Sequence, residues 1–280
     1  MSNIQMTPDR YRKILSEYDT IFAHAREMSN HMAERLVVEK HLSYAETIFT
    51  KLVCHALSLR RLAPTLQPAS QELWDIGALC AVARALVEAF DALAYISLHA
   101  VTPAEREIRI LAWELHEREH RLHMLEDIGA SGPDVDAIRR DAETLHTAVT
   151  SHTFYPELPK DMRGKIATRK TPAFLRSQKE RNIASGINSD FYNSVTMYLS
   201  QYVHTLPLAL SQLMLTHAGD PGALQLVAMP LQYSMAFMAK ASVGIESLWP
   251  DVRIQMTEED ENVVNLWISL AEKGVKGLGS

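Results

Sequence analysis

Cysteine is scarce in this sequence of 280 residues, and signals of β-structure are missing. The two cysteines, Cys54 and Cys80, lie in apolar stretches with helical periodicity, so they supply neither a disulfide framework nor a metal-ligand set. No stretch sustains the apolar–polar alternation of a strand, and no Asn-Gly or Asp-Gly pair marks a hairpin turn. These absences predict an all-α protein in a reducing compartment.

A signal peptide and a membrane span are also not expected. The first nine residues are polar and lack the basic-then-apolar layout of a signal peptide. The most apolar stretch, residues 76–98, is long enough to cross a bilayer, but Arg84, Glu88 and Asp91 lie near its middle, where charge is costly in lipid. We therefore expect a buried helix, no membrane partner and a cytoplasmic location.

Capping residues and prolines divide the chain into about seven to nine helices. Thr7-Pro8 and Thr102-Pro103 each place a capping hydroxyl before a proline suited to the first helical turn. Ser70 is expected to cap the long apolar helix, and Pro207 to kink a later one. The predicted helices cover residues 8–40, 44–61, 71–99, 103–129, 133–152, 190–217, 223–248 and 258–273. We expect one helical domain, residues 1–280.

Residues 153–188 differ from the remainder of the chain. They are poor in periodic apolar residues and hold three prolines and two glycines, which predicts an extended basic connection with at most a short helix over 173–184. Between residues 153 and 181, eight residues are basic and three acidic, although the whole chain has a net charge of −6. This 153–181 segment could contact the phosphates of RNA or a nucleotide, or simply the acidic remainder of the chain.

Charged residues follow one face of the helix over 71–99. Arg84, Glu88, Asp91 and Tyr95 are spaced by four, three and four residues. Because a helix that is apolar nearly all round is usually buried, these charges should be desolvated and paired. Glu119, near the middle of the apolar face of the next helix, is the expected partner of Arg84. The charges form either a structural buried ion pair or part of a ligand site.

Three histidines, His116, His120 and His123, line one edge of the helix over 103–129. Two Glu-x-x-His patterns are typical of bundles that hold paired iron. However, Glu117 points away from the apolar face, and the usual alternation with lone-glutamate helices is missing. We therefore expect no metal and no cofactor. Arg118 and His123 have the Arg-x4-His spacing used by RNases of the HEPN superfamily, a spacing that arises easily by chance in such a helix.

Ser200 and His204 lie on the polar side of the helix predicted from residue 190, where periodicity alone indicates a solvated stripe. A resemblance adds to this reading. The pattern Arg84-x3-Glu88, followed by Tyr192, Leu199, Ser200, Val203 and His204, resembles the core of an uncharacterised bacterial helical family that is distantly HEPN-like. The resemblance covers about residues 74–215. It implies that Arg84, Glu88, Ser200 and His204 belong to one site, and it brings no established activity.

No residue set in the sequence fixes a reaction. We therefore predict a non-catalytic helical binding or regulatory protein of a bacterial stress or defence system. One alternative is a metal-independent HEPN-like RNase with Arg84, Glu88 and His204 as catalytic candidates. The other is a small-molecule or nucleotide sensor, whose ligand-binding candidates also include Glu119 and Ser200. The apolar helix over 223–248 further predicts self-association into a homo-oligomer.

Overall fold

The computed structural model describes residues 5–33, 35, 37–66 and 74–277, and these contain eleven α-helices and no strand. The predicted all-α class is confirmed, and the predicted number of helices is too low. Instead of one domain, the chain forms two compact units: Met1–Leu98 with Asn182–Ser280 (unit 1), and His99–Arg181 (unit 2). None of the described helices combines the length and apolarity needed to cross a bilayer.

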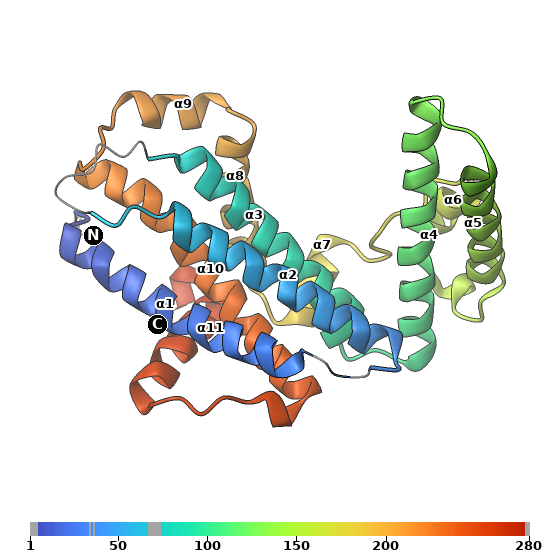
Figure 1. Ribbon diagram of the computed structural model, residues 1–280, viewed down its shortest axis with the longest axis horizontal. Helices are drawn as coiled ribbons and strands as arrows, with labels where there is room; N and C mark the ends of the chain where they lie inside the picture. The colour runs from blue at the N-terminus through green and yellow to red at the C-terminus, as the bar shows by residue number, and fades with distance from the viewer. Residues whose placement is uncertain (1–4, 34, 36, 67–73, 278–280) are drawn as a thin grey trace. The chain divides into compact units, whose positions relative to one another are not determined.

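Unit 1 is built around one apolar helix, α10, which packs against α1, α2, α3 and α11 (Figure 1). Phe237 of α10 is fully buried, and its ring lies 5.5 Å from that of Phe90, 5.9 Å from Phe191 and 6.1 Å from Tyr192. The helices of this unit are α1 (Pro8–Met32), α2 (Lys40–Leu62), α3 (Ile76–Leu93, extended by a π-helical turn, Ala94–Leu98), α8 (Ser189–Val203), α9 (Pro207–Met214), α10 (Pro221–Leu248) and α11 (Glu258–Gly277); a 3-10 turn, Pro250–Val252, follows α10.

The burial of α10 removes the basis of one prediction. Self-association was predicted from the apolar helix over 223–248, and Met235, Phe237 and Met238 of this helix are fully buried within unit 1. Their apolarity is explained by core packing, because a helix that is apolar nearly all round is surrounded by other elements. A homo-oligomer stays a prediction without an assigned surface.

The capping residues predicted the starts of two helices correctly, whereas the kink predicted at Pro207 is not found. The Thr7 and Thr102 hydroxyls accept hydrogen bonds from backbone N–H groups three residues later, at 3.3 and 3.2 Å, as predicted. Pro207 begins a new helix, α9, and does not kink α8, because Thr205 has a left-handed φ of 52° that interrupts the helix. Ser70 lies outside the described residues, within which Asp75 caps α3 by accepting from Ala78 N at 2.8 Å.

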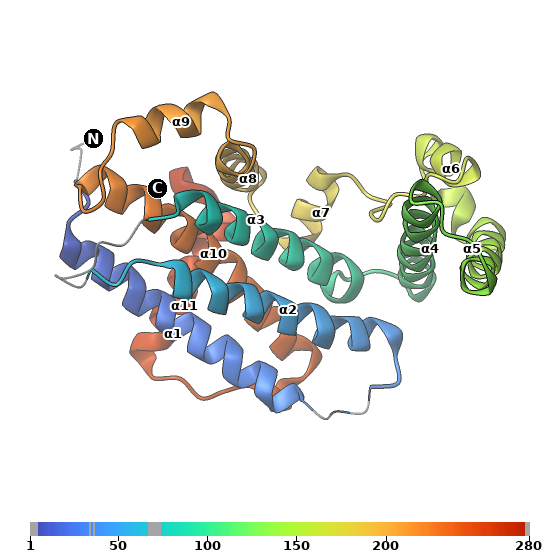
Figure 2. The ribbon, with the colours of Figure 1, turned by 45° about the horizontal axis from the view of Figure 1, so that its top comes forward.

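Unit 2 is a helical hairpin with a short third helix. It contains α4 (Pro103–Asp127), α5 (Pro133–Ser151), a 3-10 turn (Tyr155–Glu157) and α6 (Lys160–Ala167), while α7 (Gln178–Ser185) begins in unit 2 and ends in unit 1. Helices α4 and α5 lie side by side (Figure 2). The hydrophobic core of this unit is a cluster of buried residues: Ile108, Ala112, Leu115, Val149, Leu158, Ile166 and Leu175.

The predicted connection over 153–188 contains more helix than expected. It includes the 3-10 turn, α6 and α7; α6 was not predicted, whereas α7 overlaps the short helix expected over 173–184. Leu158, Ile166 and Leu175 are buried in the unit 2 core. Because these three apolar residues are isolated and follow no helical period, the sequence pattern did not show that they are buried in one core.

Candidate functional site

Arg84 and Glu88, the predicted anchor of the site, form an ion pair on the outer face of α3. Arg84 Nε donates to Glu88 Oε1 at 2.7 Å, and the two side chains are 28% and 58% exposed. The prediction that both charges are desolvated is wrong, because α3 buries only part of its circumference and Ala81, one turn earlier, is also exposed.

Asp91, the third charge of α3, is the buried member. It is 5% exposed and accepts a hydrogen bond from the Tyr192 hydroxyl of α8 at 3.2 Å. The sequence offered no partner for Asp91, since the tyrosine lies 101 residues away. This side chain joins α3 to α8 and belongs to the packing of unit 1.

We expect Arg84→Ala to change the free energy of unfolding by no more than about 0.5 kcal/mol, because exposed ion pairs at i, i+4 contribute little. Urea unfolding at low and high salt measures this effect, with Asp91→Ala as the buried comparison on the same helix. A loss above about 1.5 kcal/mol for Arg84→Ala would show that this arginine does more than an exposed pair can.

Ser200 and His204 lie at the end of α8. Ser200 is half-buried, and its carbonyl accepts from the backbone N–H of His204 at 3.1 Å, which closes the helix. The His204 side chain is exposed. Within the described residues, neither side chain forms a hydrogen bond or ion pair with Arg84 or Glu88. The single site implied for these four residues stays a prediction.

Glu119 lies in unit 2, on the wall of a groove of about 670 Å³ formed by α4, α5 and the residues after α6. Arg84 and Glu119 thus belong to different units, and each is bonded within its own. The groove is also lined by the three histidines of α4 and by Arg139, Glu143, Arg169, Lys170 and Thr171. The edge of α4 that the sequence marked with histidines is therefore one wall of a cavity.

Two hydrogen bonds hold Thr171 against α4. Glu119 Oε2 accepts from the backbone N–H of Thr171 at 2.9 Å, and His116 Nδ1 lies 2.8 Å from the Thr171 carbonyl oxygen. Because a carbonyl only accepts, His116 Nδ1 carries the proton. In the neutral ring, Nε2 is then a hydrogen-bond acceptor. The contact fixes both the position of the 153–181 segment and the tautomer of His116.

Two polar atoms of this wall lack partners. Glu119 Oε1 and Thr171 Oγ1 are buried and make no hydrogen bond among the described residues. Thr171 as a whole is 2% exposed. Leaving a buried acceptor or hydroxyl unsatisfied costs about 1–3 kcal/mol each, and such groups in a native wall call for an explanation. A molecule bound in the groove would supply one.

The other polar groups of the groove are arranged around this wall. The rings of His116 and His120 are 4.1 Å apart. Arg139 pairs with Glu126 at 3.2 Å, and Arg169 pairs with Glu143, whereas Lys170 is exposed. Throughout the described chain, no three His, Cys, Asp or Glu side chains are placed to hold a metal ion together.

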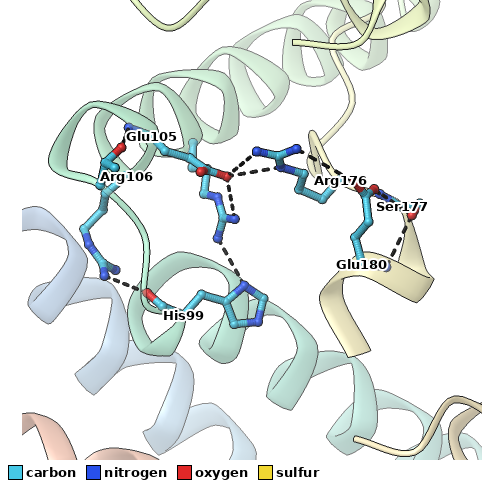
Figure 3. A network of polar contacts seen from close by, with 8 residues as sticks. His99, Glu105, Arg106, Arg176, Ser177 and Glu180 are labelled. Atoms are coloured by element: carbon cyan, nitrogen blue, oxygen red, sulfur yellow. Dashed lines mark hydrogen bonds and ion pairs between the residues drawn. The ribbon is translucent and has the colours of Figure 1, made fainter. Parts of the chain in front are cut away.

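A second polar cluster anchors the 153–181 segment to the first turns of α4 (Figure 3). Glu105 Oε1 accepts from Arg109 Nη2 at 2.8 Å and from Arg176 at 2.8 and 3.1 Å. Arg109 is only 4% exposed. Burial alone raises the pKa of Glu105, but the hydrogen bonds from Arg176 and Arg109 outweigh it, and the net pKa is lowered.

His99 completes the Glu105 network as a neutral acceptor. Arg109 Nη1 lies 3.1 Å from His99 Nδ1, and a guanidinium can only donate, so Nδ1 holds a lone pair. Burial, followed by the charge of Arg109, lowers the pKa of His99 to about 4. Its backbone carbonyl accepts from Arg106 at 2.8 Å. Glu105, Arg109, Arg176 and His99 all belong to unit 2, so the network joins elements of this unit.

Arginines and lysines of the 153–181 segment have different surroundings. The arginines are turned toward unit 2: Arg169 pairs with Glu143, Arg176 with Glu105, and the Arg181 guanidinium lies 3.9 Å from the centre of the Phe174 ring, while Arg163 is half-buried. The lysines are exposed and make no ion pair within the described residues; they are Lys160, Lys165, Lys170 and Lys179. Contact with RNA or a nucleotide stays a prediction that now depends on the lysines.

Comparison of the chain with protein-family models, curated proteins and solved structures finds no match. The resemblance to the bacterial helical family and the HEPN-like character stay predictions. The function is therefore argued from the geometry of the site.

Proposed function

We propose that this chain is a non-catalytic binding or regulatory protein whose ligand site is the groove of unit 2. The observation that carries the proposal is the pair of buried, unpartnered atoms, Glu119 Oε1 and Thr171 Oγ1, in the wall of a cavity of about 670 Å³. Cavities of this size are typical of small-molecule sites, which combine apolar lining with a few placed polar groups. A cellular role in a stress or defence response is part of the proposal.

The polar groups of the groove favour a small polar ligand. Glu119 Oε1 and His116 Nε2 are acceptors, so the ligand needs N–H or O–H donors. The Thr171 hydroxyl and the exposed ammonium of Lys170 favour an acceptor or an anionic group on the same molecule. A nucleotide and a polar amino acid both meet these requirements.

A panel of AMP, GMP, glutamate and spermidine tests the site by ligand-observed NMR and calorimetry on the full chain. For a panel member that binds, Glu119→Gln should weaken affinity about 10- to 100-fold, because a hydrogen bond to a charged acceptor is worth about 1.5–3 kcal/mol. His120→Trp, at an exposed position of the groove wall, should block the cavity without disturbing the core.

Glu117→Gln is the matched control, since Glu117 is an exposed glutamate on the same helix outside the groove lining. Its affinity should equal that of the wild type. Binding that survives both groove variants, or no binding by any panel member, counts against the proposal. Incubation with total RNA, comparing wild type with His204→Ala, tests the HEPN-like RNase; cleavage that depends on His204 would replace the proposal.

A further inference from the structure

His24 of α1 is a buried histidine with an unused ring nitrogen. The residue is 6% exposed, and its Nε2 lies 3.2 Å from Glu246 Oε1 of α10. A carboxylate only accepts, so Nε2 carries the proton and Nδ1 of the neutral ring is an acceptor. Nδ1 is buried and has no hydrogen-bond partner among the described residues. Burial lowers the pKa of His24, and the nearby charge of Glu246 only partly opposes this shift.

The imidazole lies at the wall of two cavities of unit 1. One is a groove of about 750 Å³ formed by α1, α2 and residues 254–260, and the other is a smaller space of about 140 Å³. Glu246 lines the smaller space and not the groove, so the Nε2 edge of the ring is directed toward the smaller space. The same side chain also lines the groove.

Apolar side chains form the groove surface next to His24, whereas its charged residues already have partners. The apolar lining is supplied by Leu15, Ala23, Ile254 and Met256. Of the charged lining residues, Arg60 pairs with Asp19 through two hydrogen bonds of 2.6 and 3.1 Å. Arg12 pairs with Asp9, and Glu27 lies 3.9 Å from His31. The remaining carboxylate of the lining, Asp260, accepts from the Thr257 hydroxyl at 2.8 Å. Because both arginines of the lining are paired with carboxylates, the groove has no free guanidinium for an anionic ligand.

We propose that this groove is a second ligand site, which takes a largely apolar small molecule carrying one hydroxyl or N–H group that donates to His24 Nδ1. The ligand satisfies the buried acceptor, and its apolar body covers the aliphatic wall. A donor group is required because a carboxylate or phosphate would meet the His24 lone pair with another lone pair. This site lies in unit 1 and does not depend on the function proposed for unit 2.

Phenol and anisole test this site, because they have similar size and only phenol carries a donor. Titrations of the full chain are followed by two-dimensional NMR of the histidine rings. We expect phenol to bind about tenfold more tightly than anisole, the value of one hydrogen bond to an otherwise unsatisfied acceptor. Phenol, and not anisole, should shift the Nδ1 resonance of His24, and benzoate should bind no better than anisole.

Variants connect this preference to the groove. His24→Phe should remove the difference between phenol and anisole. Ala23→Trp, at an exposed position of the wall, should block both probes, whereas Ala81→Trp, an exposed alanine of α3 outside the groove, should leave binding unchanged. If His24→Phe does not fold, Ala23→Trp still decides the location. Equal affinity of the wild type for phenol and anisole, binding insensitive to Ala23→Trp, or no binding by phenol would overturn the proposal.

Discussion

Glu105→Ala is expected to lower the free energy of unfolding of unit 2 by about 3–5 kcal/mol, because removal of one partner from a buried ion pair leaves the other charge uncompensated. Arg109 is 4% exposed and pairs with Glu105 at 2.8 Å, so its guanidinium would lose this carboxylate in the protein interior. Arg176 would lose the same acceptor, and with it the bond that holds the 153–181 segment against α4.

The loss would be large relative to the stability of this unit. Its core consists of a few buried apolar residues from α4, α5 and the 153–181 segment. Small cores provide only a few kcal/mol of net stability. Hydrogen exchange should therefore accelerate in peptides from α4 and α5 of Glu105→Ala and stay unchanged in α1 and α10.

Glu117→Ala provides the control for this experiment, since Glu117 pairs with Arg118 and Arg121 on the exposed face of the same helix. Exposed pairs contribute about 0–1 kcal/mol, so this variant should exchange like the wild type. Equal effects of the two substitutions would show that the Glu105 network does not hold unit 2 together.

The sequence predicted the parts of the fold that depend on local chemistry. The start of α4 at Thr102-Pro103 follows from capping chemistry and is confirmed. The prediction failed for Arg84 and Glu88, because apolarity around most of a helix does not reveal which narrow sector remains in water. It also failed for residues 153–181, where burial occurs at isolated positions.

The groove could be predicted only in part. The sequence singled out Glu119 and the histidine edge of α4, both of which line the cavity. Thr171 was missed, because its contact with Glu119 joins residues 52 positions apart and no local pattern marks it. His24 had a signal that was not used: it follows the buried Ile21 by three residues on α1, so a histidine lies on an otherwise apolar face.

Acid should destabilise unit 2 through His99. The folded-state pKa of His99 is lowered to about 4 by burial and then by Arg109, whereas an unfolded histidine titrates near 6.5. Between these two values the unfolded chain binds more protons than the folded one, so stability rises with pH through this window. The stabilisation is fully present above pH 6.5 and is lost as the pH falls toward 4.

The expected loss between pH 7 and pH 4 is about 3 kcal/mol, since each pKa unit corresponds to about 1.4 kcal/mol. Urea unfolding combined with hydrogen exchange of α4 and α5 measures it at both pH values. His99→Gln supplies an amide oxygen that can accept from Arg109 and does not titrate, so unit 2 of this variant should lose about 3 kcal/mol less than the wild type on acidification. An identical pH dependence in both proteins would mean that His99 accepts a proton without disturbing the Glu105 network.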